Sequence, residues 1–487
     1  MDINYLTAHK LKERLIKKEI SCTEITESIY SRIESVEEKL NSYIRLEKKN
    51  ALKKAAEVDR IISSGGDIAD FTGIPLAIKD NICTRGVTTT CASKILENYT
   101  PIYNATVIEK LEKQNFILTG KANMDEFAMG SSNENSHFGP VRNPWDTSRV
   151  PGGSSGGPAA CVAAGEAICS LGSDTGGSIR QPASLCGIVG FKPTYGMVSR
   201  YGLVAFASSL DQIGPLTRDV EDCAALLNII CGHDENDSTS IKAEVPDYKK
   251  YLGKDIKNIK VGVPRELMVE GIDREVKEAV DRALKLVEEM GGSVEEVSLP
   301  SLEHALSVYY IIAPSEASSN LSRFDGVRYG YRNLEQKTLR KMYRRSRAEG
   351  FGNEVKRRIM IGTYCLSAGY YDAYYEKAQR VRTLIINDFK KAFGKYDVLI
   401  SPTSPTTAFK IGERIEDPLT MYLSDICTIP VNLAGLPAIS IPAGLSSEGL
   451  PIGVQIIGNI LREDNVLKAA YSLEKAVGFT SRPELQN

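Results

Sequence analysis

Histidine is scarce in this chain, and its scarcity limits how catalysis could be run at neutral pH. Only four histidines occur among 487 residues, and none lies in an HExxH, HxH or Cys/His pattern with the spacing of metal ligands. Histidine is the side chain whose ordinary pKa lies nearest neutrality, so the usual neutral-pH base is nearly absent. We therefore predict no metal site, and acid–base chemistry carried by other side chains.

Long apolar runs, paired cysteines and an excess of charge are also missing. No stretch reaches the roughly 18 apolar residues of a membrane span, and the start lacks the features of a secretory signal. The ten cysteines occur singly, which favours buried reduced thiols. With 60 basic and 62 acidic side chains, the charge of −2 gives no global footprint for nucleic acid. These features predict a soluble, cytoplasmic protein without a membrane partner.

Hydrophobic periodicity favours one large α/β domain over several small ones. We expect two helices within residues 5–64, before the Ser-Ser-Gly-Gly break at 63–66. Strands and helices then alternate. We expect strands at 74–78, 116–119, 167–172, 259–263, 398–400, 438–441 and 452–456, and helices at 105–114, 156–165, 273–290 and 462–476.

Three regions can be distinguished within this single domain of residues 1–487. Residues 1–66 form an N-terminal helical region, and residues 67–220 form a core that contains the motifs described below. Residues 302–390 are largely helical and could supply a surface for a partner.

The motif with the clearest chemical meaning is a glycine loop, DTGGSIR at 174–180. Two glycines before a serine that opens a helix leave backbone N–H groups free near the hydroxyl, at the positive end of the helix dipole. Such groups could bind the oxyanion formed when the same serine attacks a carbonyl. A structural interpretation stays open, in which Ser178 is only the N-cap of the helix and the glycines form a tight turn.

An earlier glycine loop, GGSSGG at 152–157, matches several known motifs only in part. Ser154 stands where GxGxxG requires its second glycine, and no Lys-Ser/Thr follows the last glycine as in a P-loop. The letters GxSxG would place Ser154 at a nucleophile elbow, but that elbow must follow a buried strand. The preceding segment 143–151 is polar and bounded by prolines, so the context fails.

A lysine at the end of an apolar strand is the leading candidate for the base. Lys79 directly follows residues 74–78, where partial desolvation would lower its pKa from about 10.4 toward the range of a neutral amine. Two simpler interpretations remain open at this point. The lysine could reach solvent, or it could pair with the adjacent Asp80.

Three segments together, GIPLAIKDN at 73–81, GGSSGG and DTGGSIRQPA at 174–183, resemble the amidase signature family in order and separation. The resemblance implies a central mixed sheet covered by helices on both faces. It also implies a triad in which Ser178 attacks the amide carbonyl, while Ser154, in a cis peptide, relays the proton to Lys79. The backbone N–H groups of Thr175, Gly176, Gly177 and Ser178 would form the oxyanion hole.

Within that family, segments 124–146, 315–330 and 352–364 resemble the glutamine-hydrolysing components of tRNA-dependent amidotransferases. This resemblance implies that Arg358 clamps the α-carboxylate of glutamine and Asp425 holds its α-ammonium, with Tyr309 nearby. From the residues alone each has a simpler interpretation. Arg358 would be a solvated charge in a basic stretch, Asp425 a surface or cap residue, and Tyr309 a packed aromatic.

The reaction that this resemblance implies is hydrolysis of glutamine to glutamate and ammonia through an acyl-enzyme at Ser178. Ammonia would pass to a B subunit, which activates the glutamate of mischarged Glu-tRNA(Gln) with ATP and magnesium, while a small C subunit supports assembly of the heterotrimer. No cofactor is then expected in this chain, and amidation of Asp-tRNA(Asn) stays open. The alternatives are a stand-alone amidase acting on another amide, and a non-catalytic scaffold whose glycine loops are only structural.

Overall fold

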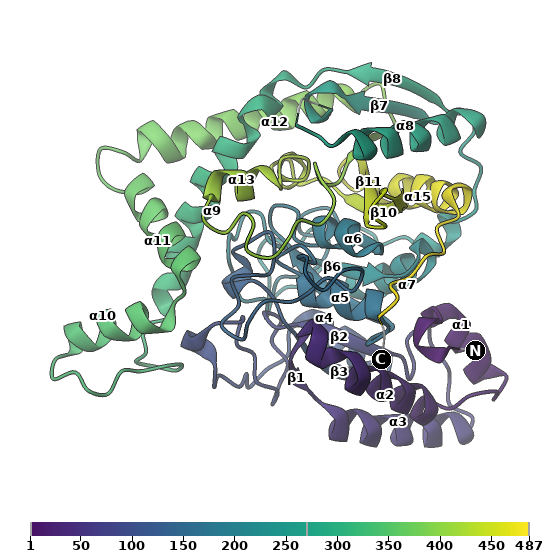
Figure 1. The fold of residues 1–487 in the computed structure, drawn as a ribbon, viewed down its shortest axis with the longest axis horizontal. Coiled ribbons are helices and arrows are strands. Elements are labelled where there is room, and N and C mark those ends of the chain that lie inside the picture. Colours follow the sequence, from purple (N-terminus) through teal and green to yellow (C-terminus); the bar gives the residue numbers. More distant parts are fainter. Residues whose placement is uncertain (1, 269–270, 486–487) are drawn as a thin grey trace.

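An 11-stranded mixed sheet forms the centre of the computed structural model, which describes residues 2–268 and 271–485 (Figure 1). Its strand order is β1-β3-β2-β4-β6-β5-β10-β11-β9-β7-β8. The strands are β1 (Tyr43–Leu46), β2 (Pro75–Lys79), β3 (Ile117–Ala122), β4 (Cys169–Asp174), β5 (Val189–Lys192), β6 (Gln212–Thr217), β7 (Lys260–Pro264), β8 (Ser293–Val297), β9 (Val398–Pro402), β10 (Ala438–Leu445) and β11 (Pro451–Gly458).

The helices connect these strands and form a projecting arm. They are α1 (Ala8–Ile16), α2 (Cys22–Leu40), α3 (Lys48–Ser63), α4 (Thr106–Glu112), α5 (Gly156–Ala164), α6 (Arg180–Cys186), α7 (Val220–Ile230), α8 (Arg274–Glu289), α9 (Ala305–Asn320), α10 (Leu339–Gly350), α11 (Asn353–Cys365), α12 (Lys377–Ala392), α13 (Pro418–Leu423), α14 (Ile429–Leu433) and α15 (Glu463–Val477). Figure 1 shows α10 and α11 standing out from the body of the molecule. The largely helical character predicted for residues 302–390 is confirmed by α9 to α12.

Helices cover both faces of the sheet because side chains alternate along its strands. On β9, Val398 and Ile400 belong to the hydrophobic core that includes side chains of α8 and α15. Leu399 belongs instead to a second core that includes side chains of α9 and α12. The predicted fold class, a single α/β domain with a mixed sheet between helices, is confirmed. Its division at residues 66, 220 and 302 stays a prediction.

The predicted core elements are present, but the N-terminal region differs from the prediction. β2-α4-β3 and β7-α8-β8 are parallel units, as the alternation of strand and helix predicts. The prediction of two helices within residues 5–64 is wrong, since the structure has three, with β1 between α2 and α3. β1 is only 4 residues long and pairs antiparallel with β3, so its identity as a strand comes from a distant partner.

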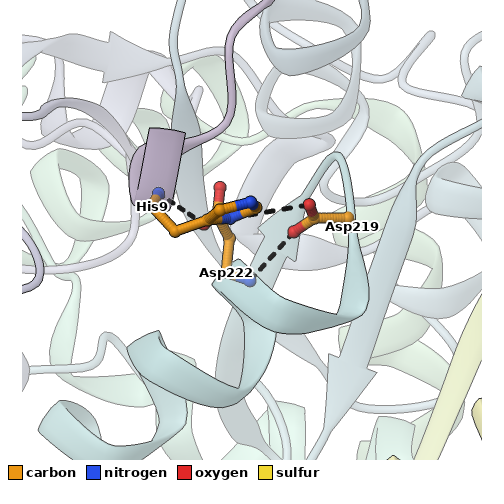
Figure 2. Close-up of side chains that lie close together, drawn as sticks. All are labelled: His9, Asp219 and Asp222. Atoms are coloured by element: carbon orange, nitrogen blue, oxygen red, sulfur yellow. Dashed lines mark hydrogen bonds and ion pairs between the residues drawn. The ribbon is translucent and has the colours of Figure 1, made fainter. Parts of the chain in front are cut away.

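The first helix is anchored to the start of α7 (Figure 2). Asp222 accepts the N–H groups of Ala8 at 2.5 Å and His9 at 3.0 Å, and one of its oxygens lies 2.9 Å from His9 Nδ1. Within the described residues, His9, Asp219 and Asp222 are the one group whose donor atoms are arranged as metal ligands could be. Because both Asp222 oxygens already accept N–H groups, we interpret the cluster as a cap on α1.

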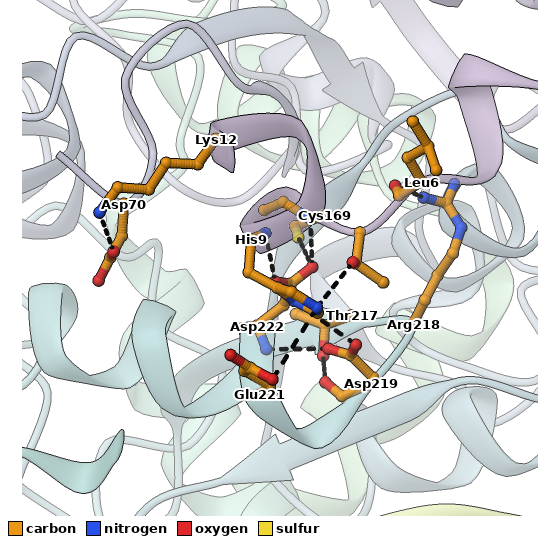
Figure 3. A network of polar contacts seen from close by, with 12 residues as sticks. Leu6, His9, Lys12, Asp70, Cys169, Thr217, Arg218, Asp219, Glu221 and Asp222 are labelled. Carbon is orange, nitrogen blue, oxygen red and sulfur yellow. Dashed lines mark hydrogen bonds and ion pairs between the residues drawn. The ribbon is translucent and has the colours of Figure 1, made fainter. Parts of the chain in front are cut away.

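Arg218 extends this anchor to the end of α5 (Figure 3). Its guanidinium donates to the carbonyl of Leu6 at 3.1 Å, and to those of Val162 at 2.9 Å and Ala167 at 2.8 Å. The Val162 carbonyl lies in the last turn of α5, where carbonyls lack partners further along the helix, and Arg218 supplies a donor for it. The N-terminal helices are therefore packed on the same domain as the motifs.

Two expectations from composition can be compared with the structure. All ten cysteines are buried and free, so the prediction of buried reduced thiols is confirmed. None of the helices formed by the described residues is long and apolar enough to cross a membrane.

Candidate active site

Parallel pairing of β2 with β4 brings Lys79 to the loop that contains Ser178. Ile78 pairs with Leu171 in parallel register, so the two strands end at the same edge of the sheet. β2 ends at Lys79, and β4 ends at Asp174, where the DTGGSIR loop begins. Two motifs that are far apart in the sequence therefore meet at one edge.

Lys79 is surrounded by hydrogen-bond acceptors in the interior. Its Nζ lies 2.8 Å from the hydroxyl oxygen of Ser154, 2.8 Å from that of Ser155, and 3.2 Å from the carbonyl of Ser173. The side chain has no exposed surface, and burial lowers its pKa to about 7. Asp80 lies beside a different lysine. The structure thus excludes both simpler interpretations of Lys79, and it leaves an amine that can act as a base near neutral pH.

The GGSSGG loop holds Ser154 against the second glycine loop. The Gly153–Ser154 peptide bond is cis, as the family resemblance implies. The N–H of Ser155 donates to the carbonyl of Ser178 at 3.1 Å, so the two loops are hydrogen-bonded right beside Ser154. A Cβ atom at Gly153 would lie 2.1 Å from a buried carboxylate oxygen, which explains why this position needs glycine.

Exposure separates the possible roles of the two serines. Ser178 keeps 8% of its surface exposed, whereas Ser154 and Lys79 keep none. Part of Ser178 therefore faces solvent, whereas the Ser154 hydroxyl lies in the interior, 2.8 Å from the amine. This arrangement suits Ser178 as the nucleophile and Ser154 as a relay.

The predicted helix does not open at Ser178, and that detail of the prediction is wrong. α6 begins at Arg180, and its N-cap is Ile179, without a side-chain cap. Asp174 accepts N–H groups of the loop instead, which holds the segment before Arg180 out of the helix. The interpretation of Ser178 as a simple N-cap is therefore excluded.

The loop retains backbone donors for an oxyanion. The N–H of Gly177 is already occupied, since it donates to the carboxylate of Asp174 at 2.8 Å. The N–H groups of Thr175, Gly176 and Ser178 have no hydrogen-bond acceptor within the described part of the chain. Of the four N–H groups predicted to form the oxyanion hole, that of Gly177 is therefore already used, and those of Thr175, Gly176 and Ser178 stay candidates.

A buried arginine that was not predicted from the sequence braces the same aspartate. Arg180 donates to Asp174 at 3.0 Å through Nε and at 3.0 Å through a terminal nitrogen, and both side chains are fully buried. Arg180 also donates to Gln455 at 2.5 Å and to the carbonyl of Thr428 at 3.3 Å. Burial alone would raise the pKa of Asp174, but the charge and hydrogen bonds of Arg180, together with Lys192 and Asn432, outweigh it and lower the pKa to about 2.

Replacing Asp174 by asparagine is expected to lower the free energy of unfolding by about 3–5 kcal/mol, because it leaves the charge of Arg180 buried without a counter-charge. Denaturant titration measures this loss, and Asp281→Asn on the exposed face of α8 is the matched control. The folded chain holds fewer protons at Asp174 than the unfolded chain between pH 2 and 3.8, so its stabilisation is lost as the pH falls through that interval. A variant as stable as the control would contradict the ion-pair interpretation.

Arg358 is buried, which excludes its interpretation as one more solvated charge. Only 3% of it is exposed, and its guanidinium carbon lies 5.4 Å from the ring centre of Tyr310 and 5.5 Å from that of Tyr422. Its Nε donates to Glu354 at 2.7 Å. The two terminal nitrogens have no hydrogen-bond acceptor among the described residues, so the fork is open toward a carboxylate.

Asp425 and Tyr309 lie in the same neighbourhood. Asp425 is 7% exposed and accepts the hydroxyl of Ser131 at 2.5 Å, and burial raises its pKa to about 7. A Cβ atom at Gly176 would lie 2.7 Å from the Tyr309 hydroxyl, so this tyrosine packs on the nucleophile loop. Burial raises the pKa of Tyr309, and Arg358 and Asp425 are the next strongest influences on it. The structure thus brings all three predicted residues to one place.

Two contacts of the site were not predicted, although the sequence holds a signal for each. Ser155, the second serine of GGSSGG, binds Lys79 as closely as Ser154 does. Glu354 precedes Arg358 by 4 positions on α11, which is the spacing at which opposite charges pair on a helix.

Comparison with known proteins places this geometry in a family. The amidase family model matches residues 24–467. The A subunit of the glutamyl-tRNA(Gln) amidotransferase of Desulforamulus reducens is 61% identical over 486 residues, which cover 100% of both chains. The crystal structure of the corresponding A subunit of Thermotoga maritima has a TM-score of 0.83 and 46% identity, covering 100% of this chain and 99% of that one. The native peptide amidase of Stenotrophomonas maltophilia has a TM-score of 0.84 and 27% identity, covering 99% of each chain. The chain therefore belongs to the amidase family.

Proposed function

We propose that the chain is the glutamine-hydrolysing A subunit of a glutamyl-tRNA(Gln) amidotransferase. This proposal is carried by one observation: a set of residues suited to catalysis and a set suited to binding an amino acid lie in the same site. The buried pair of Lys79 and Ser154 supplies a base beside Ser178, and Arg358 and Asp425 supply charges for the two ends of a free amino acid. The full-length identity of 61% to the protein of Desulforamulus reducens supports the same conclusion.

In the acylation half of the reaction, the Ser178 hydroxyl attacks the side-chain amide carbonyl of glutamine. Its proton passes to Ser154, whose own proton passes to the neutral amine of Lys79, and free N–H groups of the loop hold the oxyanion. The carbon–nitrogen bond then breaks, and the proton returns along the same route to the departing ammonia. The product is a γ-glutamyl ester on Ser178, which water hydrolyses by the same sequence of proton transfers to give glutamate.

The stand-alone amidase is the second candidate, and the charged residues argue against it. A simple amide has neither a carboxylate for Arg358 nor an ammonium for Asp425, so both buried groups would be without use. The raised pKa of Asp425 agrees with a site that is completed by a cation, because a bound ammonium would favour the ionised carboxylate. The scaffold interpretation gives no account of a buried amine with a lowered pKa that lies 2.8 Å from two serine hydroxyls.

We further propose that the ammonia serves a partner. The relatives that are A subunits of an amidotransferase belong, by that name, to a multi-subunit enzyme. In the proposed cytoplasmic heterotrimer, a B subunit activates the glutamate of Glu-tRNA(Gln) with ATP and magnesium, and a C subunit supports assembly. This chain then needs no cofactor of its own, and the choice between Glu-tRNA(Gln) alone and Asp-tRNA(Asn) as well belongs to the partner.

The test is to purify the chain with its native partners and to supply glutamine, ATP, magnesium and mischarged Glu-tRNA(Gln). We expect Gln-tRNA(Gln) to form with glutamine as the nitrogen source, and Asp-tRNA(Asn) can be assayed in parallel. A purified chain that hydrolyses simple amides but not glutamine would favour the stand-alone amidase.

Replacing Arg358 by alanine is expected to raise the KM for glutamine about 10- to 100-fold, since a charge-assisted hydrogen bond contributes about 1.5–3 kcal/mol. Hydrolysis of a simple primary amide should change little, because that substrate has no carboxylate. Arg357→Ala is the matched control, as Arg357 also pairs with Glu354 but is 44% exposed. An unchanged KM for glutamine would remove the specificity argument.

A further inference from the structure

Tyr310 carries a hydroxyl that is buried without a partner. Among the described residues, no group donates to or accepts from its oxygen. Leaving a buried polar group unpaired is energetically costly, so native structures rarely retain one without a function. The hydroxyl is therefore a candidate for a group that is satisfied only when a ligand is bound.

The ring of Tyr310 is fixed on three sides. It stacks on Tyr422 with ring centres 3.8 Å apart, and it meets Tyr309 edge to face at 5.0 Å. The guanidinium carbon of Arg358 lies 5.4 Å from its ring centre. Because these contacts leave the ring little freedom, the position of its hydroxyl is set by the fold and not by the ligand.

The charges around this hydroxyl are those of the proposed glutamine site. Burial raises the pKa of Tyr310, and the next strongest influences on it are Asp425, which raises it, and Arg358, which lowers it. Both residues are assigned to the two ends of the amino acid. The unpaired hydroxyl thus belongs to the place where the head group of glutamine would lie.

We propose that Tyr310 is a further specificity residue, whose hydroxyl donates a hydrogen bond to the α-carboxylate held by Arg358. This inference rests on the proposed function. The two terminal nitrogens of Arg358 can each donate to this carboxylate. The phenol hydroxyl of Tyr310 would be the third donor to it. A substrate without that carboxylate leaves the hydroxyl unpaired, and a site built in this way rejects such a substrate more strongly than an apolar pocket can.

Replacing Tyr310 by phenylalanine tests the hydroxyl alone, because the ring and its stacking remain. We expect the KM for glutamine to rise about 10-fold with kcat unchanged, since uniform binding is lost. Thermal stability should not fall, because an unpaired polar group is removed. Tyr248→Phe is the matched control, since Tyr248 also has a buried hydroxyl without a described partner but packs in the core that contains α8 and α15.

Two truncated substrates locate the contact. Glutaramate keeps the carboxylate and lacks the amine, whereas 4-aminobutanamide keeps the amine and lacks the carboxylate. Tyr310→Phe should reduce kcat/KM for glutaramate about as much as for glutamine, and should leave that for 4-aminobutanamide unchanged. A loss that follows the amine instead, or equal kinetics in Tyr310→Phe and Tyr248→Phe, would overturn the proposal. If Arg358→Ala still raises the KM for glutamine in that case, the proposed function stands without Tyr310.

Discussion

Replacing Ser178 by alanine is expected to abolish the release of ammonia from glutamine, with a fall in rate of about 10⁴-fold or more. Ser178 is partly exposed, whereas Ser154 and Ser155, the serines that contact Lys79, are fully buried and are poorly placed to take over the attack. Ammonia release by the purified complex measures the effect. Mass spectrometry of the chain after brief exposure to glutamine should show the γ-glutamyl ester in the unmodified protein and not in the variant.

The control for this variant is Ser472→Ala on α15, where the serine is half-buried and donates only to the carbonyl of Lys468. Both variants should give the circular dichroism and unfolding midpoint of the unmodified chain. Retained turnover in Ser178→Ala would contradict the mechanism. If an ester were still trapped and mapped to Ser154, the nucleophile elbow suggested by the letters GxSxG would have to be reconsidered.

The parts of the site that could be predicted depend on residues close together in the sequence. The apolar run that ends at Lys79 is a buried strand in any α/β arrangement, so a desolvated amine follows from five neighbouring residues. The glycines of the second loop likewise indicate free backbone N–H groups before any fold is known. What these local patterns could not decide was whether Ser178 caps the helix, because that depends on the side chain of Asp174.

The other parts of the site could not be predicted, because they depend on contacts between distant segments. Such contacts produce no periodic pattern in the sequence. Arg358 lies at the end of a strongly basic stretch and looks solvated, yet it is buried by aromatic rings from three other segments of the chain, with Phe206 at 5.7 Å among them. Arg180 likewise meets Thr428, which is 248 positions away. Tertiary packing of this kind decides whether a charge is exposed or buried, and hence whether it can select a substrate.

Burial also supplies the near-neutral base for which few histidines are available in this sequence. An amine in water is protonated at neutral pH and cannot take a proton from a serine. Removing all solvent from Lys79 disfavours its charged form and brings its pKa to about 7. The chain reaches the working range of a histidine by placing a lysine at the buried end of a strand.

Replacing Lys79 by methionine is therefore expected to lower glutaminase activity about 10²- to 10⁴-fold, the usual contribution of a positioned general base. In the unmodified enzyme, the rate should rise with pH through about 7, as Lys79 loses its proton, and should level off above that value. The residual rate of Lys79→Met at saturating glutamine, where ionisation of the ammonium-binding Asp425 no longer limits the rate, should lack this inflection. Steady-state rates of the purified complex, measured from about two pH units below to about two above neutrality, show both effects.

Lys192 provides a matched control for this prediction. It is also fully buried, burial lowers its pKa to about 7, and its Nζ donates to the carbonyl of Pro193 at 2.9 Å. If any buried amine could produce the inflection, Lys192→Met would alter it as well. We expect Lys192→Met to keep the pH profile and Lys79→Met to lose it. The contribution of Lys79 to the free energy of unfolding should rise between pH 7 and 10.5, because there the unfolded chain holds the Lys79 proton that the folded chain has released, and Lys79→Met should lose this contribution. A pH profile that survives in Lys79→Met would show that another group is the base.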